Sequence, residues 1–432
     1  MSTTPHPMRD KRRVLFAALM GTAVEFYDFF IYGTAAALVF GPVFFPAESQ
    51  AAQTLLAFAS FGIAFLARPI GAAFFGHFGD RIGRKSTLVA SLLTMGVSTF
   101  AIALLPTYAT AGWIAPALLC LMRFGQGFGL GGEWGGAALL TAEHAPKGWE
   151  SRFVSIMQLG SPIGFLAANG VFLLLGLLLS EEQFMAWGWR IPFLASALLV
   201  AIGLYVRLKI EETPQFQAAV ERENVVRVPF VDVVSRHGLH LIAGAAGVVS
   251  TFAVFYIATS FALALAVGEL GYDRQSILMV QMVANGFYVA GILMAGRLAD
   301  GIGPARVLAG GAIATAIVGL IFEAGMRSGS LLLLGATLCA AMLVLGFNNG
   351  PLGSWLASLF PVRLRYTGVS LAFNAGGILG GAVVPFVAQL LVVQGLSRNT
   401  GVLLFLAGLA TLAGTAFARP ARIIDMEKGR VD

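Results

Sequence analysis

Long apolar runs alternate with short polar breaks along almost the whole chain. Twelve such runs are centred near positions 27, 64, 96, 128, 166, 198, 252, 288, 316, 343, 379 and 409. Most are long enough to cross a hydrocarbon core about 30 Å thick, at about 1.5 Å per helical residue. Their apolar character is continuous, which argues against the alternation typical of a membrane β-barrel. The pattern therefore predicts an all-α membrane protein with twelve transmembrane helices.

The longest polar interval, 207–238, separates six apolar runs from six. An internal echo supports this division, because Asp80 and its flanking glycines after the second run recur around Asp300 after the eighth. Two parallel repeats are expected to hold a substrate between them near the middle of the membrane. The expected divisions are a tail at 1–13, a six-helix bundle at 14–206, a linker at 207–238, a second six-helix bundle at 239–418 and a tail at 419–432.

Composition and charge support a membrane protein rather than a nucleic-acid binder. Hydrophobic residues make up 57% of the 432 residues and charged residues 12%, against about 25% charged in soluble domains. The net charge is +6, but 22 of the 28 Lys and Arg fall on one side if the N-terminus is inside. We expect a monomer in the inner membrane with both termini cytoplasmic, surrounded by lipid, without nucleic acid or an obligate protein partner.

Charged residues inside the apolar runs are candidates for function. Each costs about 2.5–3.5 kcal/mol or more in the bilayer. Glu25 and Asp28 lie three apart, on one face of the first helix, and Arg123 and Glu133 lie in the fourth. Two carboxylates in a low-dielectric cavity cannot easily both ionise, so one can carry a proton. We assign the proton to Asp28 or Glu133. The alternative is a permanent ion network that fixes the helices, with Glu25 paired to Arg68.

A glycine-rich, charged loop follows the second run and indicates a gate. Its aspartate can accept hydrogen bonds at the N-terminus of the next helix, and its basic residues can pair with neighbouring helix ends. The alternative is that the basic residues only set topology. The predicted cytoplasmic gate comprises Gly76, Asp80, Arg81, Gly83, Arg84, Glu143, Arg152, Asp300 and Arg365.

These motifs resemble those of the major facilitator superfamily. The loop Gly76-x-x-x-Asp-Arg-x-Gly-Arg-Lys85 resembles its loop signature, and the strings 21–29, 123–136, 189–193 and 359–368 are similar to its metabolite:proton symporter branch. That branch includes shikimate, 2-oxoglutarate, citrate and proline/betaine carriers. The resemblance implies proton-driven uptake of a small organic acid or zwitterion, whereas composition and repeat imply only a transporter.

Two departures from the family pattern fall in the second half. Pro304 and Ala305 replace basic residues after the eighth run, and Ser358 replaces the acidic residue usual before Leu-Phe-Pro. We therefore expect the gate to be weaker in the second half, and we expect Glu143 and Arg152 to act with Arg84 in the first.

Polar residues within the runs are candidate substrate ligands, although interhelical hydrogen bonding is the alternative role of each. An arginine with amides suits a carboxylate, whereas paired acids with tyrosines suit a quaternary ammonium group, so the substrate stays open. The predicted substrate-binding residues are Arg123, Tyr32, Gln158, Tyr256, Gln281, Asn285, Tyr288, Asn348, Asn349 and Asn374.

Other functions remain as alternatives. A proton antiporter, exporter or uncoupled facilitator of a similar metabolite would use the same architecture. A receptor would need an appended signalling domain, for which we expect no room in the short tails. An enzyme is disfavoured because all five histidines lie at predicted cytoplasmic or interfacial positions and form no metal-ligand or nucleophile–base set. We expect no cofactor and no metal, with the proton as the coupling ion.

Overall fold

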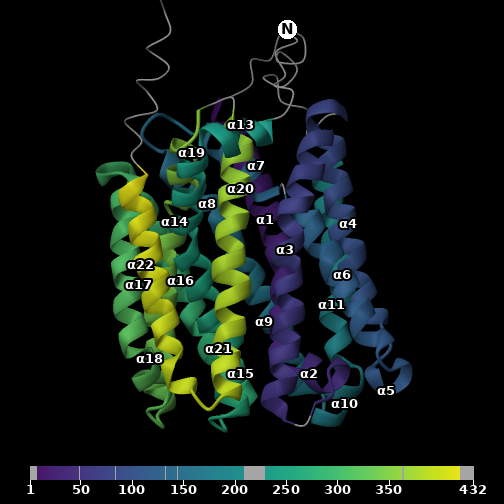
Figure 1. Ribbon diagram of the computed structural model, residues 1–432. Helices are drawn as coiled ribbons and strands as arrows, with labels where there is room; N and C mark the ends of the chain where they lie inside the picture. Colours follow the sequence, from purple (N-terminus) through teal and green to yellow (C-terminus); the bar gives the residue numbers. More distant parts are fainter. Residues whose placement is uncertain are drawn as a thin grey trace, which may run out of the picture.

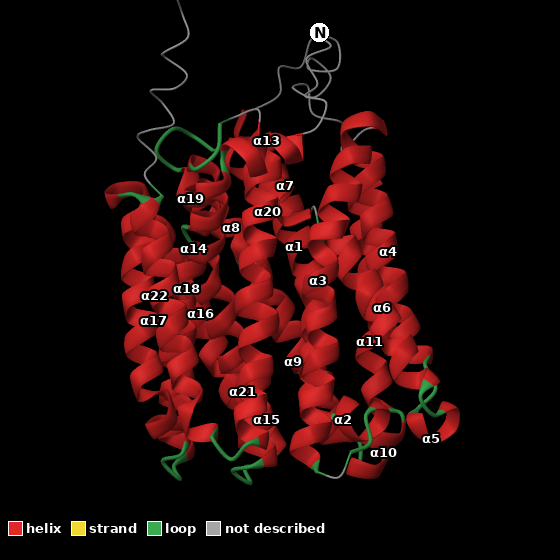
Figure 2. Ribbon diagram, in the orientation of Figure 1, coloured by secondary structure: helices red, strands yellow, loops and turns green. Residues whose placement is uncertain are grey.

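The computed structural model describes residues 7–47, 49–82, 84–131, 133–143, 145–208, 229–361 and 364–418. For 7–14, 17, 76–82, 84–88, 140, 143, 206–208 and 229–230 only the backbone is described. Helices account for nearly all of these residues, and no strand occurs among them. Figures 1 and 2 show the long helices side by side in one tall bundle.

Twelve helical segments of the first half precede the undescribed part of the linker. In chain order they are α1 (Pro7–Leu38), α2 (Phe40–Phe44), α3 (Gln50–Ile82), α4 (Arg84–Leu104), α5 (Tyr108–Ala111), α6 (Ile114–Leu130), α7 (Glu133–Glu143), α8 (Glu150–Gln158), α9 (Gly160–Leu178), α10 (Glu181–Ala186), the 3₁₀ turn η1 (Gly188–Arg190) and α11 (Ile191–Leu208).

The second half repeats the arrangement. Its segments are α13 (Pro229–Arg236), α14 (Gly238–Tyr256), η2 (Ile257–Phe261), α15 (Ala262–Gly268), α16 (Arg274–Ile302), α17 (Pro304–Met326), α18 (Leu331–Asn349), α19 (Leu352–Ser358), α20 (Arg365–Gly377), η4 (Ile378–Val383), α21 (Val384–Val393), η5 (Ser397–Asn399) and α22 (Thr400–Phe417).

The apolar runs become the expected membrane spans. Ten helical stretches of the described residues are long and apolar enough to cross a membrane. The shorter apolar stretch Val89–Leu104 in α4 and the 32-residue α1 occupy the two remaining positions. Several spans consist of two consecutive helices, such as α6 with α7 and α8 with α9. The expected all-α fold with twelve spanning segments is confirmed.

The element bounds can be compared with the expected divisions. α1 begins at Pro7, inside the expected tail 1–13, and α11 ends at Leu208. Within the expected linker 207–238, residues 209–228 lie outside the described part, and the helix α13 follows. The two ends of the bundle are called the α13 end, where α1 begins, and the α2 end, where α2, α5 and α10 lie (Figure 1).

Two spans of the second half contain a π-helical turn that the apolar pattern does not predict. η2 interrupts the span of α14 and α15, and η4 interrupts the span of α20 and α21. η2 lies against α1, and η4 against α3. Such turns are frequent at functional sites. Here both of them lie where the second half meets the first.

The halves touch along two lines. On one, α8 and α9 pack against α16; on the other, α1 and α3 pack against η2, η4, α20 and α21. The close approach of α8 and α16 requires Gly296, because a Cβ at that position would collide with the Ser155 hydroxyl. Contacts of α7 with α19 and α20 also join the halves.

Candidate transport site

The charged residues predicted inside the first half are all buried. Glu25 and Asp28 lie on α1, Arg68 on α3, Arg123 on α6 and Glu133 on α7. The carboxylate of Glu25 attracts the guanidinium of Arg68, as expected for neighbouring helices. Arg123 and Glu133 belong to the same membrane-spanning stretch, Ile114–Leu139.

The carboxylate of Asp28 is buried in the first half. Its side chain is 1% exposed and lies beside the hydroxyl groups of Thr99 on α4 and Ser196 on α11. Neither carboxylate oxygen has a hydrogen-bond partner among the described residues, and the Ser196 hydroxyl has none either. An ionised carboxylate in such a place is costly unless it is paired. The site therefore favours either a protonated Asp28 or the approach of a cation.

A chain of neutral groups connects the surroundings of Asp28 to Arg123. The Nη1 of Arg123 donates to Oε1 of Gln126 at 2.9 Å, and Nε2 of Gln126 donates to the Thr99 hydroxyl at 2.7 Å. Neither Gln126 nor Thr99 was predicted from the sequence as a functional residue. Gln126 could have been found, because it follows Arg123 by three residues and so shares its helix face.

Aromatic rings enclose the Arg123 guanidinium. Its Cζ lies 4.0 Å from the ring centroid of Tyr32, 4.3 Å from that of Phe29 and 4.6 Å from that of Phe61. Arg68 lies over the same Phe29 ring at 4.4 Å, so this ring contacts two guanidinium groups. Cation–π attraction then replaces part of the hydration that both cations lose on burial.

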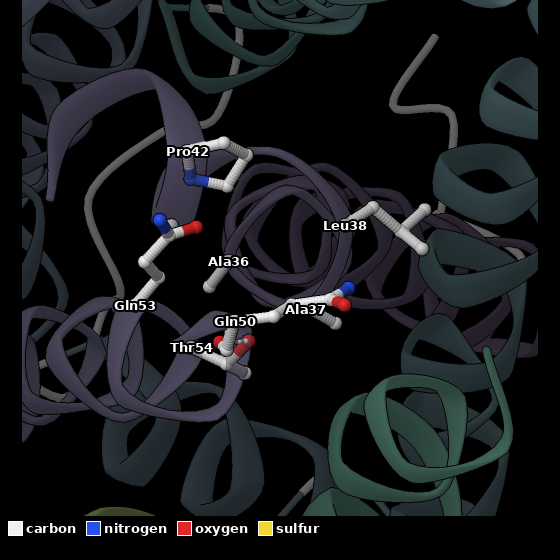
Figure 3. Close-up of a pocket in the computed structure, with 8 residues that line it drawn as sticks. Ala36, Ala37, Leu38, Pro42, Gln50, Gln53 and Thr54 are labelled. Atoms are coloured by element: carbon white, nitrogen blue, oxygen red, sulfur yellow. Dashed lines mark hydrogen bonds between the residues drawn. The ribbon is translucent and has the colours of Figure 1, made fainter. Parts of the chain in front are cut away.

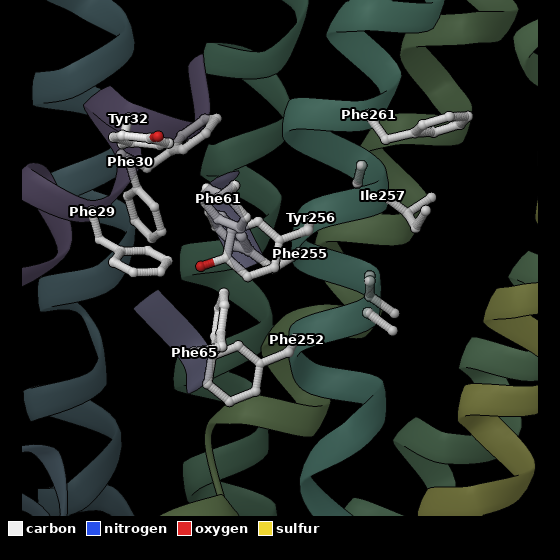
Figure 4. Packing of buried hydrophobic residues seen from close by; sticks show 14 of the residues in the cluster. Phe29, Phe30, Tyr32, Phe61, Phe65, Phe252, Phe255, Tyr256, Ile257 and Phe261 are labelled. Carbon is white, nitrogen blue, oxygen red and sulfur yellow. The ribbon is translucent and has the colours of Figure 1, made fainter. Parts of the chain in front are cut away.

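The ring cluster crosses from the first half to the second. On the second-half side, Tyr256 of α14 lies edge-on to Phe61, with centroids 4.9 Å apart. Phe65 packs edge-on against Phe252 at 5.6 Å (Figure 4). This contact is called the aromatic seam, and it consists of Phe29, Tyr32, Phe61, Phe65, Phe252 and Tyr256.

A second contact between the halves is polar. It is called the polar seam, and it consists of Gln158, Ser161, Asn169, Gln281, Asn285, Tyr288 and Asn349, all buried. The amide of Gln158 donates to the Asn349 side chain, whose own amide donates to the Tyr288 hydroxyl. Nearer the α2 end, Asn169 donates to Oε1 of Gln281 at 3.3 Å.

The polar seam is tied to both halves by further bonds. Asn285 donates to the carbonyl of Pro162 at 3.0 Å, across the halves. Gln281 also donates to the carbonyl of Thr259 in the π-helical turn η2, at 2.8 Å. Gln158 accepts from the indole of Trp134 at 3.1 Å. These bonds show how five of the predicted polar residues meet at one interface.

Comparison with known proteins identifies the class. Over 416 residues the chain is 47% identical to the inner membrane metabolite transport protein YhjE of Escherichia coli (strain K12), covering 94% of each protein. The family model "Sugar (and other) transporter" matches residues 14–228. The solved structure of the major facilitator superfamily proton:xylose symporter XylE, bound to 6-bromo-6-deoxy-D-glucose, matches with a TM-score of 0.75. The chain belongs to the major facilitator superfamily.

Within this superfamily the chain groups with metabolite transporters. It is 36% identical to the shikimate transporter of Escherichia coli (strain K12) over 393 residues, which is 88% of each protein. The XylE match covers 95% of this chain and 96% of that one at 17% identity, which shows the shared fold. The expected family, the all-α fold and the assignment as a transporter rather than an enzyme are confirmed. The protein is a multi-pass membrane transporter.

Two predicted ligands lie apart from the seams of this transporter. Asn348 is fully buried but donates to the Thr315 hydroxyl of α17 at 2.8 Å, inside its own half. It therefore does not face the first half. Asn374 on α20 donates to the carbonyl of Gly131 at 2.8 Å and so bridges the halves where α6 and α7 meet. Tyr256 is not in the polar seam but in the aromatic one.

At the α13 end, an ion pair between described residues joins the halves of the transporter. Arg152 on α8 lies 3.0 Å from Asp300 on α16, and the backbone amide of Ser151 donates to the other carboxylate oxygen at 2.9 Å. Arg365 instead donates to the carbonyl of Phe360 in its own loop. Of the other predicted gate residues, Gly83 lies outside the described part of the chain, and only the backbone is described for Gly76, Asp80, Arg81, Arg84 and Glu143. Where Arg152 was expected to act with Arg84, the described pairing is with the second-half carboxylate.

At the α2 end, a second ion pair joins the halves. Arg274, the first residue of α16, lies 3.0 Å from Glu181 of α10. Gln389 on α21 donates to the carbonyl of Ala51 at 3.2 Å. The halves therefore touch at both ends in this structure.

A cavity of about 280 Å³ also lies at the α2 end. It is lined by Ala36, Ala37, Leu38, Gly41, Pro42, Gln50, Gln53 and Thr54 (Figure 3). All of these residues belong to the first half, and none is charged. The cavity is thus separate from the buried charges.

The described residues show no cluster of three or more His, Cys, Asp or Glu side chains that could hold a metal. Cys120 and Cys339 are free thiols.

Proposed function

We propose that this transporter takes up a small organic acid or zwitterion together with protons, by alternating access. Asp28 carries the proposal, because a fully buried carboxylate without a hydrogen-bond partner among the described residues needs a proton or an approaching cation. The names of two similar proteins, a shikimate transporter and a proton:xylose symporter, support both parts of the proposal.

The link through Gln126 suggests how proton and substrate binding are coupled. With Asp28 protonated, Gln126 holds one side of the Arg123 guanidinium, whose Nη2 has no hydrogen-bond partner within the described part of the chain. Loss of the proton leaves a negative charge in the interior, which attracts the guanidinium of Arg123. Substrate binding to Arg123 and proton binding to Asp28 then favour each other, as symport requires.

We infer that the halves open at one end at a time, because among the described residues an ion pair joins them at each end. Breaking Arg152–Asp300 opens the α13 end, and breaking Arg274–Glu181 opens the α2 end. The excess of Lys and Arg favours placing the α13 end and both termini in the cytoplasm. We propose that one chain acts as a monomer without a cofactor, with the proton as its coupling ion.

Proteoliposomes containing a pH-sensitive dye test the proposal. Shikimate, di- and tricarboxylates, aromatic acids, proline and betaine are added outside without an imposed gradient. Internal acidification by one class is expected. Asp28→Asn should abolish the acidification, because an amide cannot release a proton.

A matched control is Asp232→Asn, which changes a carboxylate on α13 that is paired only with Arg236 at the surface. It should acidify like the wild type. Entry of labelled substrate without acidification would overturn symport and indicate an uncoupled facilitator. Alkalinisation on entry would indicate an antiporter.

A further inference from the structure

We propose that the substrate is a ring-bearing monocarboxylate, held with its carboxylate on Arg123 and its flat ring among the side chains of the aromatic seam. This inference rests on the proposed function, since it names the substrate class of the same site. It selects one of the two classes that the sequence left open, a carboxylate or a quaternary ammonium compound.

The carboxylate position follows from the hydrogen bonds of Arg123. Nε donates to the carbonyl of Phe61 at 3.4 Å and Nη1 donates to Gln126, but Nη2 has no acceptor among the described residues. Arg123 is 0% exposed and belongs to none of the ion pairs that the described residues form. A buried donor with full charge and no acceptor indicates a place for an anionic oxygen.

The charge of the ligand follows from the second arginine. Arg68 is attracted by the carboxylate of Glu25, which lies in the same half. Arg123 belongs to no ion pair in the described part of the chain, and a protonated Asp28 would not balance its charge. One carboxylate on the ligand can pair with Arg123, whereas a second carboxylate would lose its hydration without an arginine to receive it.

The ring preference follows from how the seam is built. Tyr256 meets Phe61 at an interplanar angle of 69° and Phe65 at 85°, and Phe65 meets Phe252 at 89°. These edge-to-face contacts join the first half to the second, so they separate when the halves move apart. A flat ring entering between them restores the same contacts, which a flexible aliphatic chain does less well. The planar geometry thus selects for shape as well as for burial.

The same rings are unsuited to a quaternary ammonium group. Such a group needs aromatic faces that are free of other cations. Here the Phe29 ring already has a guanidinium at 4.3 Å and another at 4.4 Å, and the Tyr32 ring has one at 4.0 Å. A third positive charge would be repelled by both. The structure therefore favours the acid over the ammonium alternative.

Calorimetric titration of the purified full chain in lipid nanodiscs, without a proton gradient, tests the inference. The probes are benzoate, hexanoate as a non-cyclic carboxylate, benzamide as an uncharged ring, and glycine betaine. Benzoate is expected to bind at least tenfold more tightly than each of the other three. Equal or tighter binding of hexanoate or betaine, or no binding of benzoate, would overturn the inference.

Two variants assign the contacts. Phe61→Leu should weaken benzoate at least fivefold and leave hexanoate within twofold, while Arg123→Gln should weaken both carboxylates at least thirtyfold. Arg190→Gln is the matched control, because Arg190 also lies over a ring, that of Trp189 at 4.3 Å, but outside both seams. If Arg123→Gln does not fold, binding of the four probes to the wild type and to Phe61→Leu still tests the inference.

Failure of this inference can be told apart from failure of the proposed function. Tight benzoate binding with no acidification in the dye assay would support a ring-bearing acid as the ligand and would contradict proton symport. Acidification by a non-cyclic acid alone, with no benzoate binding, would support proton symport and would contradict the inference that the substrate bears a ring.

Discussion

The two seams between the halves differ in chemistry. The polar seam joins α8 and α9 to α16 and α18 through amides and hydroxyls, whereas the aromatic seam joins α1 and α3 to α14 through rings. Hydrogen bonds are directional and contribute about 0.5–1.5 kcal/mol net each, while ring packing tolerates several orientations. We infer that the polar seam fixes the register of the halves and the aromatic seam accepts the substrate.

The helix α16 shows how this division works within one element. It is 29 residues long, roughly 43 Å at 1.5 Å per residue. Arg274 and Asp300 near its ends form the two ion pairs between the halves, and Gln281, Asn285 and Tyr288 between them belong to the polar seam. This one helix thus contacts the first half from one end of the bundle to the other. We therefore infer that a displacement of α16 at one end also changes its contacts at the other end.

The largest expected effect comes from Arg123→Lys. Lysine keeps the charge but loses the planar group that lies among three rings and the forked donors that reach Gln126 and Phe61. We expect the initial rate of substrate uptake into proteoliposomes to fall at least hundredfold. The control Arg190→Lys should retain at least half of the rate. Wild-type rates in Arg123→Lys would show that charge alone suffices and that the aromatic seam has no part in recognition.

A smaller effect is expected from the polar seam. Gln158→Leu removes the acceptor of the Trp134 indole and the donor to Asn349 at once. Leaving buried polar groups without partners costs about 1–3 kcal/mol each, so uptake should slow about tenfold or more because the closed arrangement of the halves is destabilised.

A control within the second half sharpens this expectation. Asn348→Leu also removes a buried amide, but one that bonds to Thr315 in its own half. Both variants should lower the melting temperature, but only Gln158→Leu should increase labelling of a cysteine placed in the polar seam. Equal labelling would mean that the seam does not hold the halves together.

The sequence predicts this architecture well because its strongest signal is the apolar run. Runs of about 20 residues predict spans regardless of how the spans pack. The buried charges were found in the same way, since each one interrupts an apolar run. The two π-helical turns were not predicted, because η2 and η4 consist of apolar and small residues like their flanking helices.

Which polar residue faces which neighbour could not be predicted from the sequence alone. Asn348 and Asn349 are adjacent and identical, yet about 100° of helical rotation turns one toward Thr315 and the other toward Tyr288. Both were predicted as ligands, and only Asn349 reaches the interface. The pairing of Arg152 with Asp300 likewise depends on how the two bundles dock, which no motif within either bundle specifies.

A moderate effect is expected at the α13 end. Asp300 is nearly buried, with a side chain 4% exposed, whereas Arg152 is 36% exposed. Asp300→Asn keeps an acceptor for the Ser151 amide but loses the charge, so the halves should separate more readily at this end. We expect a three- to tenfold gain in labelling of a cysteine introduced beside Ser354, and a loss of uptake of similar size. Reversing the pair with Arg152→Asp and Asp300→Arg together should restore part of the uptake, and failure of this reversal would show that the pair is not what closes this end.

The smallest effect is expected at the α2 end, although its ion pair has the same length. Glu181 is 67% exposed there, and pairs open to water contribute about 0–1 kcal/mol. Arg274 also lies over the Phe184 ring at 4.3 Å, a contact that remains when the carboxylate is removed. Glu181→Gln should therefore change uptake less than twofold, and this effect should shrink further in 0.5 M salt, whereas the effect of Asp300→Asn should persist because buried pairs are screened less. A large loss in Glu181→Gln would contradict the argument from exposure and would mean that the two ends are closed with similar strength despite their different burial.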